Sequence, residues 1–133
     1  MENFEFTFIP PEIEKSYQKI ILLNGVQVLA SGYFPKAFGH DFKRQAEPFT
    51  VIIFCTAGKG YYEYKNKVWE VNAGDILYCW HGTQHHYWAD KDKPWTIFWL
   101  HVQGKEIDLF LNEMKLSLQV PVLSIGVSPL LIS

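Results

Sequence analysis

The sequence predicts an all-β fold, an antiparallel sandwich or barrel that is followed by one C-terminal amphipathic helix. Three observations predict it: short apolar or alternating segments recur from Phe49 onward, turn residues separate them, and helical periodicity begins only after Lys105. The turns recur about every 8 to 12 residues, a spacing typical of antiparallel sandwiches and barrels. Parallel strands would need helices between them, and none is predicted between residues 49 and 104.

The individual strands are predicted from alternation and from β-branched or aromatic residues. Residues 4–8 alternate phenylalanine with polar residues, which indicates a strand or an extended arm lying on the barrel, ended by Pro10 and Pro11. Glycine or asparagine accepts the backbone angles of a tight turn, and turns are predicted at 57–60, 66–67 and 73–74. The further predicted strands are 26–33, 50–56, 61–65, 68–71, 75–80, 85–89 and 95–102.

The C-terminal part has a different pattern, which predicts an amphipathic helix over 105–118. The apolar residues that recur there at helical spacing are Ile107, Phe110, Leu111, Met114 and Leu118. Residues 128–132 have the features of an N-cap, a first-turn proline and the start of another apolar helix. We therefore expect a barrel with its arm at 1–104 and a helical part at 105–133 that continues in a longer protein.

Composition and charge exclude several classes of protein. The chain has 133 residues, 48% of them hydrophobic and 20% charged, which is typical of one globular domain. The net charge is −2 and no basic stripe follows any segment, so this chain is not expected to bind nucleic acid by itself. The N-terminus lacks the features of a signal peptide and no segment is apolar enough to span a bilayer, so a cytoplasmic location without membrane contact is predicted.

Residues 74–85 have the spacing of the second cupin motif, G-x5-P-x-G-x2-H. Gly74 makes a hairpin turn, an apolar strand follows, and Gly82 allows the sharp turn after which His85 begins the next strand. The one departure is Trp80, which stands where the motif has proline. The chain therefore resembles the cupins, and the resemblance implies that the predicted barrel is a double-stranded β-helix, that is, a jelly-roll barrel.

The ligands of a cupin metal site are missing from the sequence. In metal-binding cupins a first motif supplies H-x-H and a glutamate, and a histidine at the place of His85 is the fourth ligand. The corresponding positions fall near Gln45, Glu47 and Val51, and His40 is off register. Since a metal needs several convergent ligands, no metal and no other cofactor is predicted.

Residues 28–104 also resemble the N-terminal ligand-binding domain of the AraC family of bacterial transcription regulators. The marks of the resemblance, in chain order, are Arg44, the hairpin at 54–62, the turn at 71–75, the strand at 85–87 and the strand at 95–102. The resemblance implies a cupin sensor joined to a pair of helix-turn-helix units that bind DNA. Those units are absent from this chain, so DNA would be contacted only through a missing C-terminal domain.

Alternation along the predicted strands selects the candidate ligand-binding residues. If His85 faces the barrel interior, Tyr87 does too, and Trp99 faces inward from the paired strand. A guanidinium suits hydroxyls or a carboxylate, and the family resemblance implies that an arginine near Arg44 touches the effector. The alternatives are a surface arginine, aromatic rings that fill the core, and an interior histidine with its bonds satisfied. The full candidate set is Arg44, Tyr62, His85, Tyr87, Trp95, Trp99 and His101.

The predicted function is sensing of a small-molecule effector, a sugar or sugar-like metabolite, by the domain of a homodimeric regulator. By analogy with the AraC family, binding would change how the arm at 4–8 or the helix at 105–118 packs. No nucleophile lies beside a base and no two carboxylates share an inward face, so no enzyme is predicted. Two alternatives stay open: a metal-dependent cupin enzyme, such as a dioxygenase or sugar isomerase, and a dimerisation module whose barrel is filled by its own aromatic residues.

Overall fold

The computed structural model describes residues 5–8 and 26–126 of the chain, and it confirms the predicted all-β antiparallel fold. One short helix accompanies the strands, α3 at Ile107–Glu113. The strands are β1 (Glu5–Phe8), β2 (Gln27–Phe34), β3 (Asp41–Arg44), β4 (Thr50–Ala57), β5 (Lys59–Tyr64), β6 (Lys67–Asn72), β7 (Asp75–Cys79), β8 (His85–Ala89), β9 (Thr96–Gln103) and β10 (Val122–Ser124).

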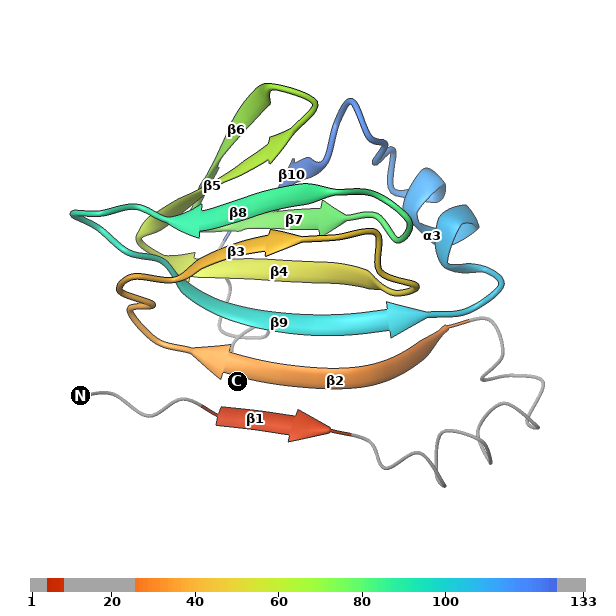
Figure 1. The fold of residues 1–133 in the computed structure, drawn as a ribbon, viewed down its shortest axis with the longest axis horizontal. Coiled ribbons are helices and arrows are strands. Elements are labelled where there is room, and N and C mark those ends of the chain that lie inside the picture. Colours follow the sequence, from red (N-terminus) through yellow and green to blue (C-terminus); the bar gives the residue numbers. More distant parts are fainter. Residues whose placement is uncertain (1–4, 9–25, 127–133) are drawn as a thin grey trace.

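The strands form two antiparallel sheets that enclose one core (Figure 1). The larger sheet has the order β1-β2-β9-β4-β7-β10 and the smaller has the order β3-β8-β5-β6. Side chains alternate between the two faces of a strand, and most inward side chains of both sheets are apolar or aromatic. Buried residues from each sheet therefore pack against one another, among them Ile53, Leu77, Tyr62 and Tyr87.

The hairpin turns use the residues that the sequence places there, with one shift of register. In the β5–β6 hairpin the two turn residues are Lys65 and Asn66, with φ of 49° and 65°, one position before the predicted pair. The turn before β7 contains Gly74 at φ 93°. Asp75 closes that turn, since its carboxylate accepts hydrogen bonds from the Asn72 N–H at 2.8 Å and from a hydroxyl of β10 at 2.6 Å.

Two strands were not predicted, and both complete the barrel. Strand β3 pairs with β8 along the edge of the smaller sheet, and β10 pairs with β7 along the edge of the larger one. Each is only three or four residues long, too short for an alternation to stand out in the sequence. The segment after the helix therefore returns to the barrel sheet.

The helix is shorter than the predicted 105–118, because a left-handed residue ends it. Lys115 has φ of 60°, and its N–H donates to the carbonyl of Asn112. The N–H of Leu116 donates back to the carbonyl of Leu111, which completes the hydrogen-bond pattern of a Schellman motif. Leu118 consequently lies beyond the helix. The helix buries Ile107 and Leu111 against the outer face of the larger sheet.

The N-terminal prediction is confirmed for residues 5–8, which pair with β2 as the edge strand β1. Phe4 and the expected helix start at 128–132 lie outside the described residues. Within the described part of the chain, no helix is long and apolar enough to cross a membrane.

Gly60 lies where the barrel has no room for a larger residue. A Cβ atom at this position would come within 2.1 Å of the Trp95 ring, and Trp95 is fully buried. We expect Gly60→Ala to lower the free energy of unfolding by about 1–3 kcal/mol, as overpacking of a core does. Urea unfolding of the wild type and the variant measures the change. The loss should shrink in a Trp95→Leu background, and an equal loss there would contradict this explanation.

Candidate ligand-binding pocket

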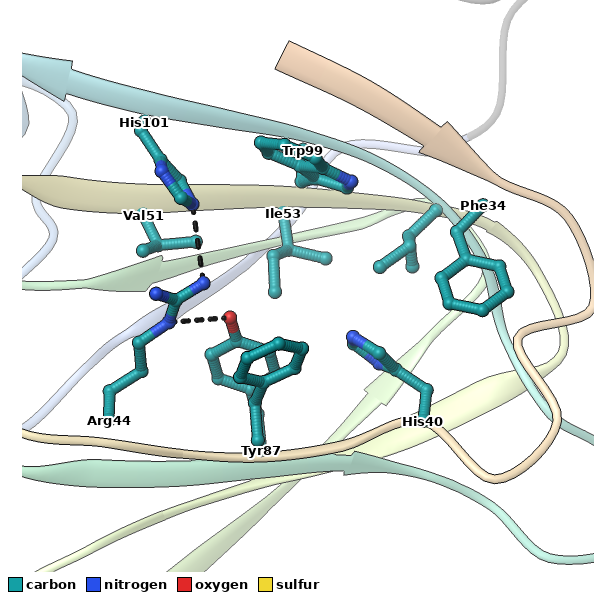
Figure 2. A pocket seen from close by; sticks show the side chains of 10 residues that line it. Phe34, His40, Arg44, Val51, Ile53, Tyr87, Trp99 and His101 are labelled. Carbon is teal, nitrogen blue, oxygen red and sulfur yellow. Dashed lines mark hydrogen bonds between the residues drawn. The ribbon is translucent and has the colours of Figure 1, made fainter. Parts of the chain in front are cut away.

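A cavity of about 150 Å³ lies inside the barrel between the two sheets (Figure 2). A cavity of similar volume is large enough to hold a six-membered ring. Its walls come from five strands and from the loop before β3, so residues far apart in the sequence meet there. The lining residues are Phe34, His40, Phe42, Arg44, Val51, Ile53, Tyr87, Ile97, Trp99 and His101.

Arg44 projects from β3 into this pocket and is held by neutral groups. Its Nε donates to the hydroxyl of Tyr87 at 3.2 Å, and its Nη2 lies 3.4 Å from Nε2 of His101 (Figure 2). The guanidinium also lies over the Phe42 ring at 4.7 Å and near the Phe49 ring at 5.8 Å. Among the described residues, no carboxylate forms an ion pair with this side chain. Arg44 is thus a partly buried cation without a counterion there.

Tyr87 offers the pocket a hydroxyl proton. Its oxygen accepts the bond from Arg44, so the O–H remains available to donate. The side chain is buried, and burial raises the pKa of this phenol to about 12 despite the nearby guanidinium. The hydroxyl therefore stays protonated at neutral pH and acts as a donor.

His101 is neutral, and its tautomer follows from its partner. Burial, aided by the positive charge of Arg44, lowers its pKa to about 4. An arginine can only donate, so Nε2 of His101 is the acceptor and the ring proton is on Nδ1. The ring stacks on Phe49 at 4.4 Å and lies against Trp99 at 4.9 Å. These contacts fix the ring, and with it the position of Arg44.

His40 lies at the other end of the pocket, opposite Arg44, and was not predicted as a site residue (Figure 2). Nε1 of Trp95 donates to its Nδ1 at 3.1 Å, and burial lowers its pKa to about 4. The neutral ring therefore carries its proton on Nε2, a further donor. His40 could have been found because it alternates with Phe42 and Arg44 and so shares their inward face. That inference requires β3 to be predicted as a strand, which it was not.

Trp99 forms part of the wall on β9 because a glycine makes room for it. The paired strand β2 has Gly32 directly opposite, and a Cβ there would lie 2.4 Å from the Trp99 ring. The indole can therefore lie close over the backbone of β2. Any larger residue at 32 would push the ring toward the cavity.

Four of the seven predicted site residues line the pocket together: Arg44, Tyr87, Trp99 and His101. The other three face inward, as alternation requires, but lie elsewhere in the barrel. Tyr62 and Trp95 are fully buried in the core, and Trp95 contacts the pocket residues His40 and Tyr87 from behind. His85 lies beside Tyr62 and Tyr87, with ring centroids 5.7 and 5.9 Å away. A role in ligand binding stays a prediction for all seven.

The donor set around His85 does not suit the metal that cupins commonly hold. The Nε2 atom of His85 is buried and has no hydrogen-bond partner in the described structure, and the same is true of the Tyr62 hydroxyl. However, the positive charge of Arg44 acts on this ring and, after burial itself, contributes to lowering its pKa to about 4. A cation would be repelled there. No group of three or more His, Cys, Asp or Glu side chains within 26–126 is placed to hold a metal.

Solved structures from three organisms share this architecture. A cupin-like protein from Thermotoga maritima aligns with a TM-score of 0.51 and 16% identity, over 95% of this chain and 78% of its own. The protein YhaK from Escherichia coli aligns with a TM-score of 0.61 and 15% identity, over 95% of this chain and 52% of its own. A Cupin 2 conserved barrel domain protein from Salinispora arenicola aligns with a TM-score of 0.51 and 12% identity, over 84% of this chain and 83% of its own. The cupin fold predicted from residues 74–85 is confirmed.

Two curated proteins resemble the chain in sequence. The MmsAB operon regulatory protein of Pseudomonas aeruginosa is 32% identical over 77 residues, 55% of this chain and 25% of the relative. The lactose operon transcription activator of Staphylococcus xylosus is 30% identical over 63 residues, 47% and 23% respectively. The chain thus spans about a quarter of the length of these regulators. The AraC-like ligand binding domain matches residues 28–131, and the chain belongs to that family.

Proposed function

We propose that this chain is the effector-binding domain of a transcription regulator and that the effector binds in the pocket around Arg44. The observation that carries the proposal is a cavity of about 150 Å³ whose wall holds a partly buried guanidinium that pairs with no carboxylate of residues 26–126. The two curated relatives are operon regulators, which supports regulation over catalysis. Arg44, Tyr87, Trp99 and His101 would contact the effector.

The sequence-based expectation for the effector is a sugar or sugar-like metabolite. The similarity to a lactose operon activator supports this class. The faces of Trp99 and Tyr87 could pack on a sugar ring, and Arg44 could donate to its hydroxyls.

The signal would pass from the pocket to a DNA-binding domain outside this chain. Strand β1 pairs with β2, which supplies Phe34 to the pocket wall, and α3 follows directly after β9, which supplies Trp99 and His101. Either element could respond to a filled pocket as a shift in population between two packings. A homodimer in the cytoplasm that contacts DNA through this further domain is part of the proposal.

The two alternative functions are less well supported. A dimerisation module with a filled barrel would have no cavity of this size. A metal-dependent enzyme would need several convergent ligands, and within 26–126 no three His, Cys, Asp or Glu side chains are placed to hold a metal ion.

Gly32→Ala tests the pocket without removing any lining residue. The added methyl group would meet the Trp99 ring and force it toward the cavity. We expect the thermal shift that an effector causes in the wild type to be largely lost in this variant. At one hundred times the dissociation constant that shift corresponds to about 2.7 kcal/mol of stabilisation. Ser31→Ala, at the neighbouring position on β2, is the control, and an equal loss of response in both variants would contradict binding beneath Trp99.

A further inference from the structure

We propose that the effector is a small monocarboxylate with an apolar body, and that its carboxylate binds Arg44 and the hydroxyl of Tyr87. This inference rests on the proposed function, because it assumes that the cavity is the effector site. The proposed effector is an anion, in place of the sugar expected from the sequence. Three properties of the pocket support it: its hydrogen-bonding groups, its charge and the nature of its walls.

The side chains of the pocket present donors and almost no free acceptor. Nδ1 of His40 already accepts from Trp95, and Nε2 of His101 lies within hydrogen-bonding distance of Arg44. What remains is the guanidinium N–H groups, the O–H of Tyr87 and the Nε2–H of His40. A carboxylate only accepts, so it matches this set. A sugar hydroxyl also donates, and among these side chains its proton would find only the second lone pair of the Tyr87 oxygen.

The charge of the pocket also favours an anion. Arg44 brings a full positive charge into a partly buried position, and the imidazoles of His40, His85 and His101 are neutral at pH 7. The nearby acidic residue on the same strand, Asp41, faces away and bonds to His86 at 2.6 Å. A bound carboxylate would therefore be the counterion that the described residues do not provide, and such charge-assisted bonds are the strong ones.

The remaining walls are suited to carbon. Between Arg44 and His40 the cavity is bordered by aromatic or aliphatic side chains, namely Phe34, Phe42, Val51, Ile53, Ile97 and Trp99. Hydroxyls placed against these walls would lose their water without gaining a partner. A ring or a branched alkyl group would instead bury apolar surface. The distribution of polar groups thus indicates an amphipathic ligand with its charged end at Arg44.

Matched ligand pairs can test the class directly. The purified 133-residue chain would be titrated with benzoate and benzamide, with cyclohexanecarboxylate and its amide, and with arabinose, glucose and lactose. Affinity would be measured by calorimetry, with thermal shift in parallel. We expect each carboxylate to bind about 10- to 150-fold more tightly than its amide, the range for hydrogen bonds to a charged group. The sugars should bind more weakly than either carboxylate.

Two variants locate the preference. Arg44→Gln should reduce the carboxylate preference to less than threefold, whereas Lys43→Gln, on the outward face of the same strand, should leave it unchanged. The wild-type comparison of acid with amide does not depend on whether either variant folds. Binding of a sugar but of no carboxylate would overturn the anion and leave the proposed function standing. Equal affinity for acids and amides would also overturn it. No binding of any probe would count against both proposals.

Discussion

The folded domain should lose stability steeply as the pH falls from about 6.5 to 4. Three histidines of the barrel interior, His40, His85 and His101, are neutral in the fold, and burial lowers the pKa of each to about 4. In the unfolded chain each would bind a proton near pH 6.5. Between these values the unfolded chain holds more protons than the folded one, so acid favours unfolding. The stabilisation is complete above pH 6.5 and is lost toward pH 4.

The slope should be unusually large because three groups titrate together. Each histidine that stays neutral in the fold contributes at most about 1.4 kcal/mol per pH unit. The groups around them oppose protonation. His85 has a buried nitrogen without a partner, and Arg44 is a positive neighbour of all three rings. Two effects act in the opposite direction: Asp41 raises the pKa of His40 and a backbone hydrogen bond at Thr83 raises that of His85, but both effects are smaller than that of burial.

Urea unfolding at pH values from 8 to 4.5, followed by tryptophan fluorescence, measures this slope. His101→Gln keeps a polar side chain at the position but removes one titrating group. It should reduce the slope between pH 6.5 and 4.5 by up to about 1.4 kcal/mol per pH unit. Its stability at pH 8 provides the reference. A slope equal to that of the wild type would show that His101 already binds its proton in the folded state.

The strands of the barrel could be predicted where they are long and alternate, and the short elements could not. Strand β4 has eight residues and β5 has six, and both were found from their patterns. Strand β10 has three residues and pairs with β7 only because the chain folds back after the helix. The early end of α3 depends on Lys115, a residue type that gives no sequence indication of a left-handed conformation.

Only some of the residues that line the pocket could be predicted from the sequence. Alternation along a strand predicts whether a side chain points into the barrel, but not how far along the barrel axis it lies. Trp95 shares the inward parity of Trp99, yet it lies buried behind His40 while Trp99 lines the cavity. Tyr62 pairs across the sheet with Tyr87, but of the two only Tyr87 lines the cavity. The position along the axis depends on how the two sheets curve over each other, and that is set by the whole structure.

Arg44→Met should abolish most effector binding while leaving the empty domain about as stable as the wild type. A methionine fills nearly the same space and suits the Phe42 and Phe49 rings on which the guanidinium lies. Removal of the guanidinium leaves the Tyr87 hydroxyl and Nε2 of His101 without their bonds to Arg44, which costs about 1 kcal/mol for each bond. Against this, a cation with no counterion among the described residues is removed from a partly buried position, which is favourable. We expect the net change in the free energy of unfolding to stay within about 1 kcal/mol.

Binding and stability should therefore separate at this residue, as expected when a side chain serves a ligand and not the fold. Loss of the hydrogen bonds to a charged effector group would weaken binding by about 10- to 150-fold, or 1.5–3 kcal/mol. The same variant should also resist acid better, because Arg44 helps to lower the pKa of His85 and His101. Chemical unfolding at pH 7.5 and at pH 5, together with effector titration, measures all three effects. If the free energy of unfolding at pH 7.5 fell by several kcal/mol, Arg44 would instead be needed to stabilise the barrel. Its charge would then no longer indicate an anionic ligand.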